Sequence, residues 1–230
     1  GLPDEAVKES RERVYSAIKN ANLAYPRKPI TVNLAPASVR KEGPSFDLPI
    51  AVGVLIAGEQ INQEEIEGAL VVGELSLDGS VRHVRGVLAI AATARQEGFK
   101  RLYVPATDAA EAALIPDLEV IPIGSLAELY AHLTGEQPIP PAQTEPVALS
   151  DPPSAQTDFS EIKGQEHVKR ALEVAAAGGH NVLMSGPPGA GKTLLARAIT
   201  SILPPLSLEE ALEVTKIYSI SDMLPSDTPL

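Results

Sequence analysis

The sequence contains no cysteine and no tryptophan, and aromatic residues make up only 3% of its 230 residues. Without cysteine the chain can form no disulfide and no thiolate metal site, and its four histidines show no spacing typical of metal ligands. So few aromatic side chains give no support to a platform on which single-stranded nucleic acid could stack. These absences argue against a zinc or disulfide-stabilised protein and against a stacking type of nucleic-acid binder.

Long apolar runs and a surplus of positive charge are also missing. No stretch approaches the roughly 18 apolar residues of a membrane span, and the N-terminus lacks the pattern of a signal peptide. We therefore expect a cytoplasmic protein with no membrane partner. The formal net charge of −11 disfavours a bulk electrostatic coat on nucleic acid, which needs clustered lysine and arginine. With 44% hydrophobic and 21% charged residues, the chain has the composition of a globular protein of one or two domains.

Proline is concentrated in one stretch that divides the chain. Residues 135–158 contain six prolines and four acidic residues but no basic residue and no hydrophobic periodicity. Such a composition favours an extended, semi-rigid linker. We therefore expect one domain over residues 1–134 and a second over residues 159–230.

The first expected domain mixes helical and strand patterns. The periodicity predicts helices over residues 3–20, 48–57, 87–96, 108–114 and 125–133, and strands over 30–34, 69–75, 101–104 and 120–123. The dipeptide Asp78-Gly79 separates two strand-like segments and predicts a hairpin with a type I′ turn. This mixture indicates an α/β or α+β sandwich.

The octapeptide GPPGAGKT, residues 186–193, is the strongest chemical signal in the chain and matches the Walker A phosphate loop. Its small residues let successive backbone N–H groups converge on phosphate oxygens, so the loop predicts binding of ATP with Mg²⁺. We expect Lys192 to reach the β- and γ-phosphates and Thr193 to ligate the metal ion. A strand over residues 181–185 and a helix over residues 192–203 complete the expected context. The residues expected to hold the nucleotide here are Gly186, Pro187, Pro188, Gly189, Ala190, Gly191, Lys192 and Thr193.

The rest of the second expected domain contains a helical pattern over residues 166–177 and a capping box, Ser207 to Glu210, that should start another helix. An acidic strand that would order Mg²⁺ and polarise water does not follow Thr193. We therefore expect a truncated α/β domain from a longer protein. By itself this chain should bind nucleotide weakly at best and not hydrolyse it.

The segment FSEIKGQEHVKRALEVAAAGGHNVLMSGPPGAGKTLLARAI resembles the AAA+ ATPases, specifically the magnesium-chelatase-like branch known as the ComM/YifB family. The resemblance implies a P-loop α/β domain with ATP and Mg²⁺, and candidate adenine contacts at Ile162 and Gly164. It also implies a homo-hexameric ring in the complete protein. In that ring an acidic strand and an arginine finger would complete the ATPase site. For the competence-associated members it implies ATP-driven work on DNA during recombination or natural transformation.

The segments NLAPASVRKEGPSFDLPIAVGVL and GELSLDGSVRHVRGVLAIAATARQEGFKRLYVP resemble the proteolytic domain of Lon proteases, a fold of the ribosomal protein S5 domain 2 type. Ser45 stands at the position of the Lon nucleophile, but Leu88 stands at the position of its basic lysine. Leucine cannot accept a proton, and a serine without a base is a negligible nucleophile. We therefore expect no catalytic residue in this domain. The Lon-like domain precedes the ATPase segment in this chain, and this domain order is similar to that of the ComM/YifB family.

Three other functions stay open at this point. An ATP-dependent serine protease is disfavoured by Leu88. A magnesium chelatase subunit that inserts the ion into a porphyrin is disfavoured by the Lon-like domain in front. The Lon-like domain could also serve only for oligomerisation, whatever the ATPase part does.

Overall fold

The computed structural model describes residues 2–3, 5–36, 38, 40–41, 43–143, 157–221 and 223. Of these, the residues up to 143 and from 214 onward form one compact unit, unit 1, and residues 157–213 form another, unit 2. The predicted linker lies largely outside the described residues, and the predicted domain boundaries stay predictions. Within the described ranges, no helix combines the length and the apolar character needed to cross a membrane.

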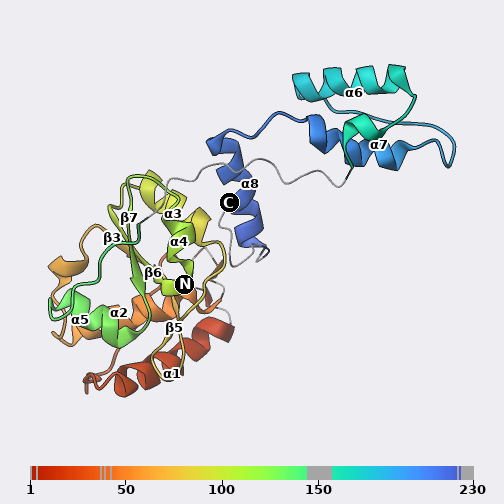
Figure 1. Ribbon diagram of the computed structural model, residues 1–230. Helices are drawn as coiled ribbons and strands as arrows, with labels where there is room; N and C mark the ends of the chain where they lie inside the picture. Colours follow the sequence, from red (N-terminus) through yellow and green to blue (C-terminus); the bar gives the residue numbers. More distant parts are fainter. Residues whose placement is uncertain are drawn as a thin grey trace. The chain divides into compact units, whose positions relative to one another are not determined.

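A parallel sheet with the strand order β3-β6-β7 forms the centre of unit 1 (Figure 1). Its strands are β3 (Ala69–Val71), β6 (Arg101–Pro105) and β7 (Glu119–Ile123). The central strand β6 is buried from Leu102 to Pro105, which is typical of a parallel strand covered on both faces. The strands expected over residues 101–104 and 120–123 are confirmed, and their observed ends differ from the expected ends by at most one residue.

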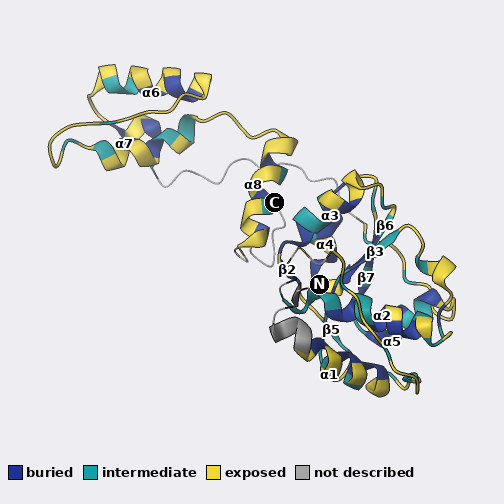
Figure 2. Cartoon of the chain, turned by 180° about the vertical axis from the view of Figure 1, so that it is seen from behind, coloured by how far each residue is buried: buried dark blue, intermediate teal, exposed yellow. Residues whose placement is uncertain are grey.

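Helices cover both faces of this sheet. On one side, α1 (Glu5–Asn20), α2 (Asp47–Ala57) and α5 (Leu126–Leu133) share a core with Tyr103 and Ile121. On the other side lie α3 (Val87–Gln96) and α4 (Ala109–Ala112), as Figures 1 and 2 show. Short 3-10 turns occur at Pro44–Phe46, Gln63–Ile66 and Ala106–Asp108, and the two-residue strands β1 (Leu2–Pro3) and β2 (Arg40–Lys41) pair in parallel. Helices on both faces of a parallel sheet place unit 1 in the α/β class.

The strand expected over residues 69–75 is divided at Gly73. Strand β3 ends at Val71, and β4 (Glu74–Leu75) turns away to pair with β5 (Val81–Arg82). The Gly73 N–H donates to the carbonyl of Ser45 at 3.1 Å, and the Gly73 carbonyl accepts from the N–H of Leu48 at 3.0 Å. The N–H and the C=O of Gly73 both bond to residues at the start of α2. They are therefore not available for a strand partner, and the strand ends before Gly73.

The hairpin expected at Asp78-Gly79 is confirmed, but its type I′ turn is wrong. The N–H of Gly79 donates to the carbonyl of Ser76 at 3.0 Å, and Gly79 alone of the two has a positive φ, 89°. A type I′ turn needs positive φ at both central residues. The Asp78 carboxylate instead accepts from the N–H of Ser80 at 3.0 Å and from its hydroxyl at 2.7 Å, which also lowers the pKa of Asp78.

The strand expected over residues 30–34 is wrong as well. This segment forms no strand, and none of its backbone groups makes a hydrogen bond to another described residue. A strand requires a neighbour that supplies the ladder of backbone hydrogen bonds, and within the described part of the chain no neighbour is present. Residues 30–34 therefore have the sequence pattern of a strand but do not form one in this structure.

Unit 2 is a small assembly of helices around one apolar cluster. Helix α6 (Glu166–Gly178) and helix α7 (Lys192–Ala198), with 3-10 turns at Phe159–Glu161 and Ile199–Ile202, bury Phe159, Ile162, Leu172, Leu195 and Ala198 together. The predicted helix over residues 192–203 is therefore α-helical only in its first half. The strand expected over residues 181–185 is wrong: Leu183 is 96% exposed, and among the described residues of unit 2 there is no strand to pair with it.

Helix α8 (Leu208–Ile220) begins with the predicted capping box. The N–H and hydroxyl of Ser207 donate to Oε2 of Glu210 at 2.8 and 2.9 Å, and the N–H of Glu210 donates to Oγ of Ser207 at 3.3 Å. These bonds to the ionised carboxylate lower the pKa of Glu210. The capping prediction is confirmed.

One half-buried histidine at the edge of the core of unit 1 has a lowered pKa. The ring of His132 packs edge-on against Tyr103 with centroids 5.7 Å apart, and its Nδ1 accepts a hydrogen bond from the N–H of Ile139 at 2.9 Å. Burial, and then the positive charge of Arg101, lowers the pKa of His132 below its ordinary value of 6.5. Protonation at Nδ1 would also remove the acceptor that Ile139 uses.

We expect unit 1 to become less stable on acidification below about pH 6.5, the ordinary pKa of histidine. Between its lowered folded pKa and that value, the unfolded chain binds more protons at His132 than the folded chain does, so stability rises with pH there and falls as pH drops. Urea unfolding at several pH values between about 5.5 and 7.5 measures this slope. His132→Asn, whose amide oxygen can still accept from Ile139, should flatten it, whereas His167→Gln in unit 2 should not. Equal slopes in the wild type and His132→Asn would contradict the assignment.

Candidate phosphate-binding site

Residues 186–191 form a loop that leads into α7, and the side chain of Lys192, the first residue of the helix, folds back across this loop. Its Nζ donates hydrogen bonds to the carbonyl oxygens of Gly186 and Pro187, both at 2.8 Å. A further bond runs from the N–H of Ala190 to the carbonyl of Pro187 at 3.3 Å. The ammonium group is therefore held beside the backbone of the loop.

Two of the three loop glycines have a conformation that requires glycine. Gly189 has a φ of 78°, and Gly191, directly before α7, has a φ of 82°. Other residues rarely adopt this left-handed region, so a side chain at either position would strain the loop. Gly186 is different: its φ is not positive, and a Cβ there would meet Ala190 only at an ordinary 3.8 Å. In this geometry the requirement for glycine therefore applies to Gly189 and Gly191.

The first turn of α7 carries the two residues expected to contact phosphate and metal. Lys192 and Thr193 begin the helix, and Thr193 is exposed. Leu195 and Ala198 of the same helix are buried in the core of unit 2 and fix its position. Pro187 and Pro188 are exposed at the tip of the loop.

The two candidate adenine contacts lie in different surroundings. Ile162 is buried in the core of unit 2, where Phe159 and Leu172 are its cluster neighbours. Gly164 is exposed and has a φ of 73°, and Gln165, just before α6, also has a positive φ of 58°. The backbone therefore makes a sharp bend between Ile162 and α6. Contact of these residues with adenine stays a prediction.

Carboxylate and imidazole groups do not assemble into a metal site in the described part of the chain. No three histidine, aspartate or glutamate side chains in those ranges come close enough to hold an ion together. Ligation of Mg²⁺ by Thr193, with further oxygen ligands from the phosphates of the nucleotide, stays a prediction.

Comparison with known proteins identifies the family. A family model described as subunit ChlI of Mg-chelatase matches residues 1–108, and one described as magnesium chelatase, subunit ChlI, matches residues 158–230. The protein YifB of Salmonella typhimurium is 44% identical over 220 residues, which are 96% of this chain and 43% of that protein. The competence protein ComM of Haemophilus influenzae is 43% identical over 223 residues, with the same coverage of both chains. The chain belongs to the ComM/YifB family.

The family membership agrees with the resemblance seen in the sequence and covers both units. The chain spans less than half the length of YifB and of ComM, 43% of each. A Lon protease of Azorhizobium caulinodans is 25% identical over 155 residues, which are 61% of this chain and 18% of that protein. The Lon similarity and the parallel sheet together support the α/β class, whereas the sandwich architecture and the truncated AAA+ domain stay predictions.

The residues that stand at the two Lon catalytic positions in the sequence lie in different elements of unit 1. Ser45 lies in the 3-10 turn that precedes α2, and its carbonyl accepts from the N–H of Gly73 at 3.1 Å. Leu88 lies in the first turn of α3 with its side chain fully buried, and its N–H donates to Oε1 of Glu111 at 3.3 Å. An alkyl side chain in a core cannot activate a serine.

A buried carboxylate next to Ser45 was not predicted from the sequence. Asp47, the first residue of α2, is 0% exposed, and its Oδ2 accepts from Nε of Arg13 at 2.6 Å. Its Oδ1 accepts from Nη2 of Arg13 at 3.1 Å and from the hydroxyl of Ser10, and the N–H of Leu75 donates to Oδ2 at 3.3 Å. The hydrogen bond to Asp47 raises the pKa of Arg13. Asp47 thus joins α1 to α2 through an ion pair and joins both to β4 through a backbone hydrogen bond.

Proposed function

We propose that this chain is the ATP-binding part of a magnesium-chelatase-like AAA+ ATPase. The observation that carries the proposal is the loop at residues 186–193, where Lys192 lies against the loop backbone and two glycines adopt left-handed conformations. Successive backbone N–H groups in such a loop favour an anion. Membership in the ComM/YifB family supports the same chemistry.

In the proposed complex Lys192 exchanges its bonds to Gly186 and Pro187 for bonds to phosphate oxygens. A lysine bond to phosphate is charge-assisted and therefore stronger than its bonds to neutral carbonyls. Thr193 would ligate Mg²⁺, and the ion would neutralise charge on the phosphates. The adenine would lie beside Ile162 and Gly164.

For the longer protein we propose a cytoplasmic homo-hexameric ring that uses ATP hydrolysis to act on DNA in recombination or natural transformation. The support is the family, and within it the relative that is named a competence protein. The net charge of −11 means that contact with DNA would come from a local surface and not from the average charge of the chain.

ATP turnover by the longer protein, measured with and without DNA, tests this function. We expect Mg²⁺-dependent ATP hydrolysis that DNA stimulates several-fold, and an ATP-dependent hexamer in light scattering. Turnover that DNA leaves unchanged would remove the DNA role and leave the ATPase intact. If the longer protein binds no ATP, the whole proposal is overturned.

The descriptions of both family models favour a second candidate, the ATPase subunit of a magnesium chelatase. This role predicts insertion of Mg²⁺ into a porphyrin in the presence of the other chelatase subunits. We rank it below the first candidate because the Lon-like segment precedes the phosphate loop. Porphyrin metallation that depends on Lys192 would reverse this order.

We also expect the protein to have no peptidase activity, because Leu88 offers no base to Ser45. A fluorophosphonate probe should leave Ser45 unlabelled in the longer protein, with and without ATP, while an active Lon protease in the same experiment is labelled. Ser45→Ala should leave ATP turnover unchanged. Labelling of Ser45, or casein degradation that Ser45→Ala abolishes, would contradict this prediction.

A further inference from the structure

Residues 30–34, which we call the open strand, have the sequence of a β-strand without the hydrogen bonds of one. Ile30, Val32 and Leu34 alternate with Thr31 and Asn33, and β-branched residues of this kind are enriched in strands. Yet no backbone N–H or C=O of the five residues bonds to another described residue. The backbone of the open strand is therefore free to pair with a neighbour.

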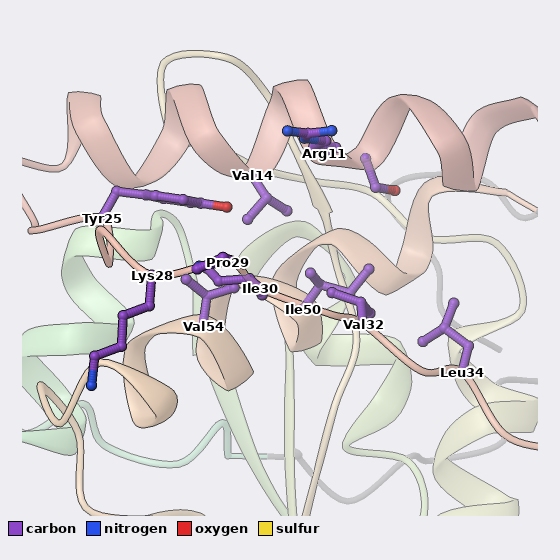
Figure 3. A pocket seen from close by; sticks show the side chains of 11 residues that line it. Arg11, Val14, Tyr25, Lys28, Pro29, Ile30, Val32, Leu34, Ile50 and Val54 are labelled. Atoms are coloured by element: carbon purple, nitrogen blue, oxygen red, sulfur yellow. The ribbon is translucent and has the colours of Figure 1, made fainter.

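A cavity of about 520 Å³ lies between the open strand and helices α1 and α2 (Figure 3). Its walls include Val14 and Tyr25 on one side and Ile50 and Val54 of α2 on the other, and the three apolar residues of the open strand also line it. Val32 is nevertheless 51% exposed. Apolar side chains thus surround a space that nothing in the described chain fills.

A second hollow of about 320 Å³ lies along the same segment, lined by Thr31, Asn33, Phe46 and Gly53 among others. The two hollows share all three apolar residues of the open strand, and the second also reaches Thr31 and Asn33, so every residue of the open strand borders an unfilled space. Both hollows are open to solvent, and together they leave a largely apolar groove beside the open strand that no described segment covers.

Two positively charged side chains lie at the rim of the larger cavity. Arg11 of α1 and Lys28, just before the open strand, line it, and both are exposed. Neither forms an ion pair with another described residue. An occupant that carries a carboxylate would complement them.

We propose that a β-strand from the same polypeptide, in the part of the longer protein outside these 230 residues, pairs with the open strand and covers the cavity. Its backbone would bond to residues 30–34, its alternate apolar side chains would enter the cavity, and an acidic residue would approach Arg11 or Lys28. Strand addition of this kind takes affinity from main-chain bonds and specificity from alternate side chains.

The size of the surface favours a strand of the same chain over a second molecule. A stable complex buries about 800 Å² on each partner, more than a pairing along five residues provides. A tethered strand needs no such area, because its effective concentration reaches the millimolar range. Relatives of more than twice this length, of which the chain covers 43%, have sequence to supply it.

The absence of cysteine from the chain allows a direct test. Val32→Cys is introduced into the 230-residue chain and into the longer protein, and the rate of maleimide labelling at residue 32 is followed by mass spectrometry of peptides. We expect labelling to be at least about tenfold slower in the longer protein, because the covering strand must open first. Leu77→Cys, in the hairpin loop of unit 1 and 58% exposed in the wild type, is the matched control and should label equally in both.

The dilution dependence of the labelling rate separates the sources of the strand. Protection at residue 32 that persists when the longer protein is diluted tenfold to nanomolar concentration supports a strand of the same chain. Protection lost on dilution points to a second copy and overturns the proposal. Equal labelling of residue 32 in the two proteins, with the Leu77→Cys control unchanged, shows that nothing covers the open strand and also overturns it.

Discussion

Replacing Lys192 with alanine is expected to weaken ATP binding by the longer protein by about 10- to 100-fold. The side chain already lies against the loop, with its Nζ at 2.8 Å from the carbonyls of Gly186 and Pro187. A bond to a charged group contributes about 1.5–3 kcal/mol, and about 1.4 kcal/mol corresponds to a tenfold change in affinity. Isothermal titration with ATP and Mg²⁺ measures the change. ATP turnover should fall to background, because the same ammonium group would stabilise the charge that develops during phosphoryl transfer.

The matched control is Arg170→Ala, which removes one positive charge from an exposed position of α6 in the same unit. It should leave ATP affinity within about twofold, since interactions of an exposed charge are largely screened by salt. Circular dichroism should show that both variants keep their helices. ATP affinity of Lys192→Ala equal to that of Arg170→Ala would mean that residues 186–193 do not bind the phosphates.

The parts of the structure that could be predicted from the sequence are those with local causes. The capping box at Ser207 depends on residues three positions apart, and the hairpin at Asp78-Gly79 depends on a glycine in a left-handed conformation. Apolar periodicity placed α2 and α3 within one residue. The phosphate-binding role of residues 186–193 stays a prediction, and the pattern that suggests it is contained in eight consecutive residues.

The wrong strand predictions share a dependence on distant partners, whereas the wrong turn type has a local cause. The segments 30–34 and 181–185 have strand-like sequences, but a strand forms only when another strand lies beside it. The type I′ turn failed because the Asp78 carboxylate bonds to Ser80, which fixes a different turn. Sequence periodicity reports which side of an element is apolar, and it does not report whether the neighbour is present.

The buried Asp47 also escaped prediction because its partners come from elsewhere in the chain. Arg13 and Ser10 lie 34 and 37 residues away, in a helix with several other charged residues. Nothing in the spacing distinguishes Arg13 from Arg11, which lies at the rim of the cavity. Asp47, two positions after Ser45, thus belongs to an internal ion pair that joins α1 to α2.

Replacing Asp47 with alanine is expected to destabilise unit 1 by about 3–5 kcal/mol, the range for breaking a buried ion pair by removing one partner. The substitution would leave the guanidinium of Arg13 without its carboxylate, and the N–H of Leu75 and the hydroxyl of Ser10 would lose the acceptor they use in the wild type. Urea unfolding followed by tyrosine fluorescence measures it, since all five tyrosines lie in unit 1 and the chain has no tryptophan.

The matched control is Glu9→Ala, which removes the other carboxylate that contacts the same arginine. Glu9 is 71% exposed, and its Oε2 accepts from Nη1 of Arg13 at 3.4 Å. An exposed i,i+4 pair contributes about 0.3–0.5 kcal/mol, so the two substitutions at one guanidinium should differ by a factor of about ten in free energy. Asp47→Asn should fall between them, because the amide oxygen keeps one acceptor while the charge is lost. If Asp47→Ala and Glu9→Ala have the same effect, burial of the ion pair is not what stabilises the junction of α1, α2 and β4.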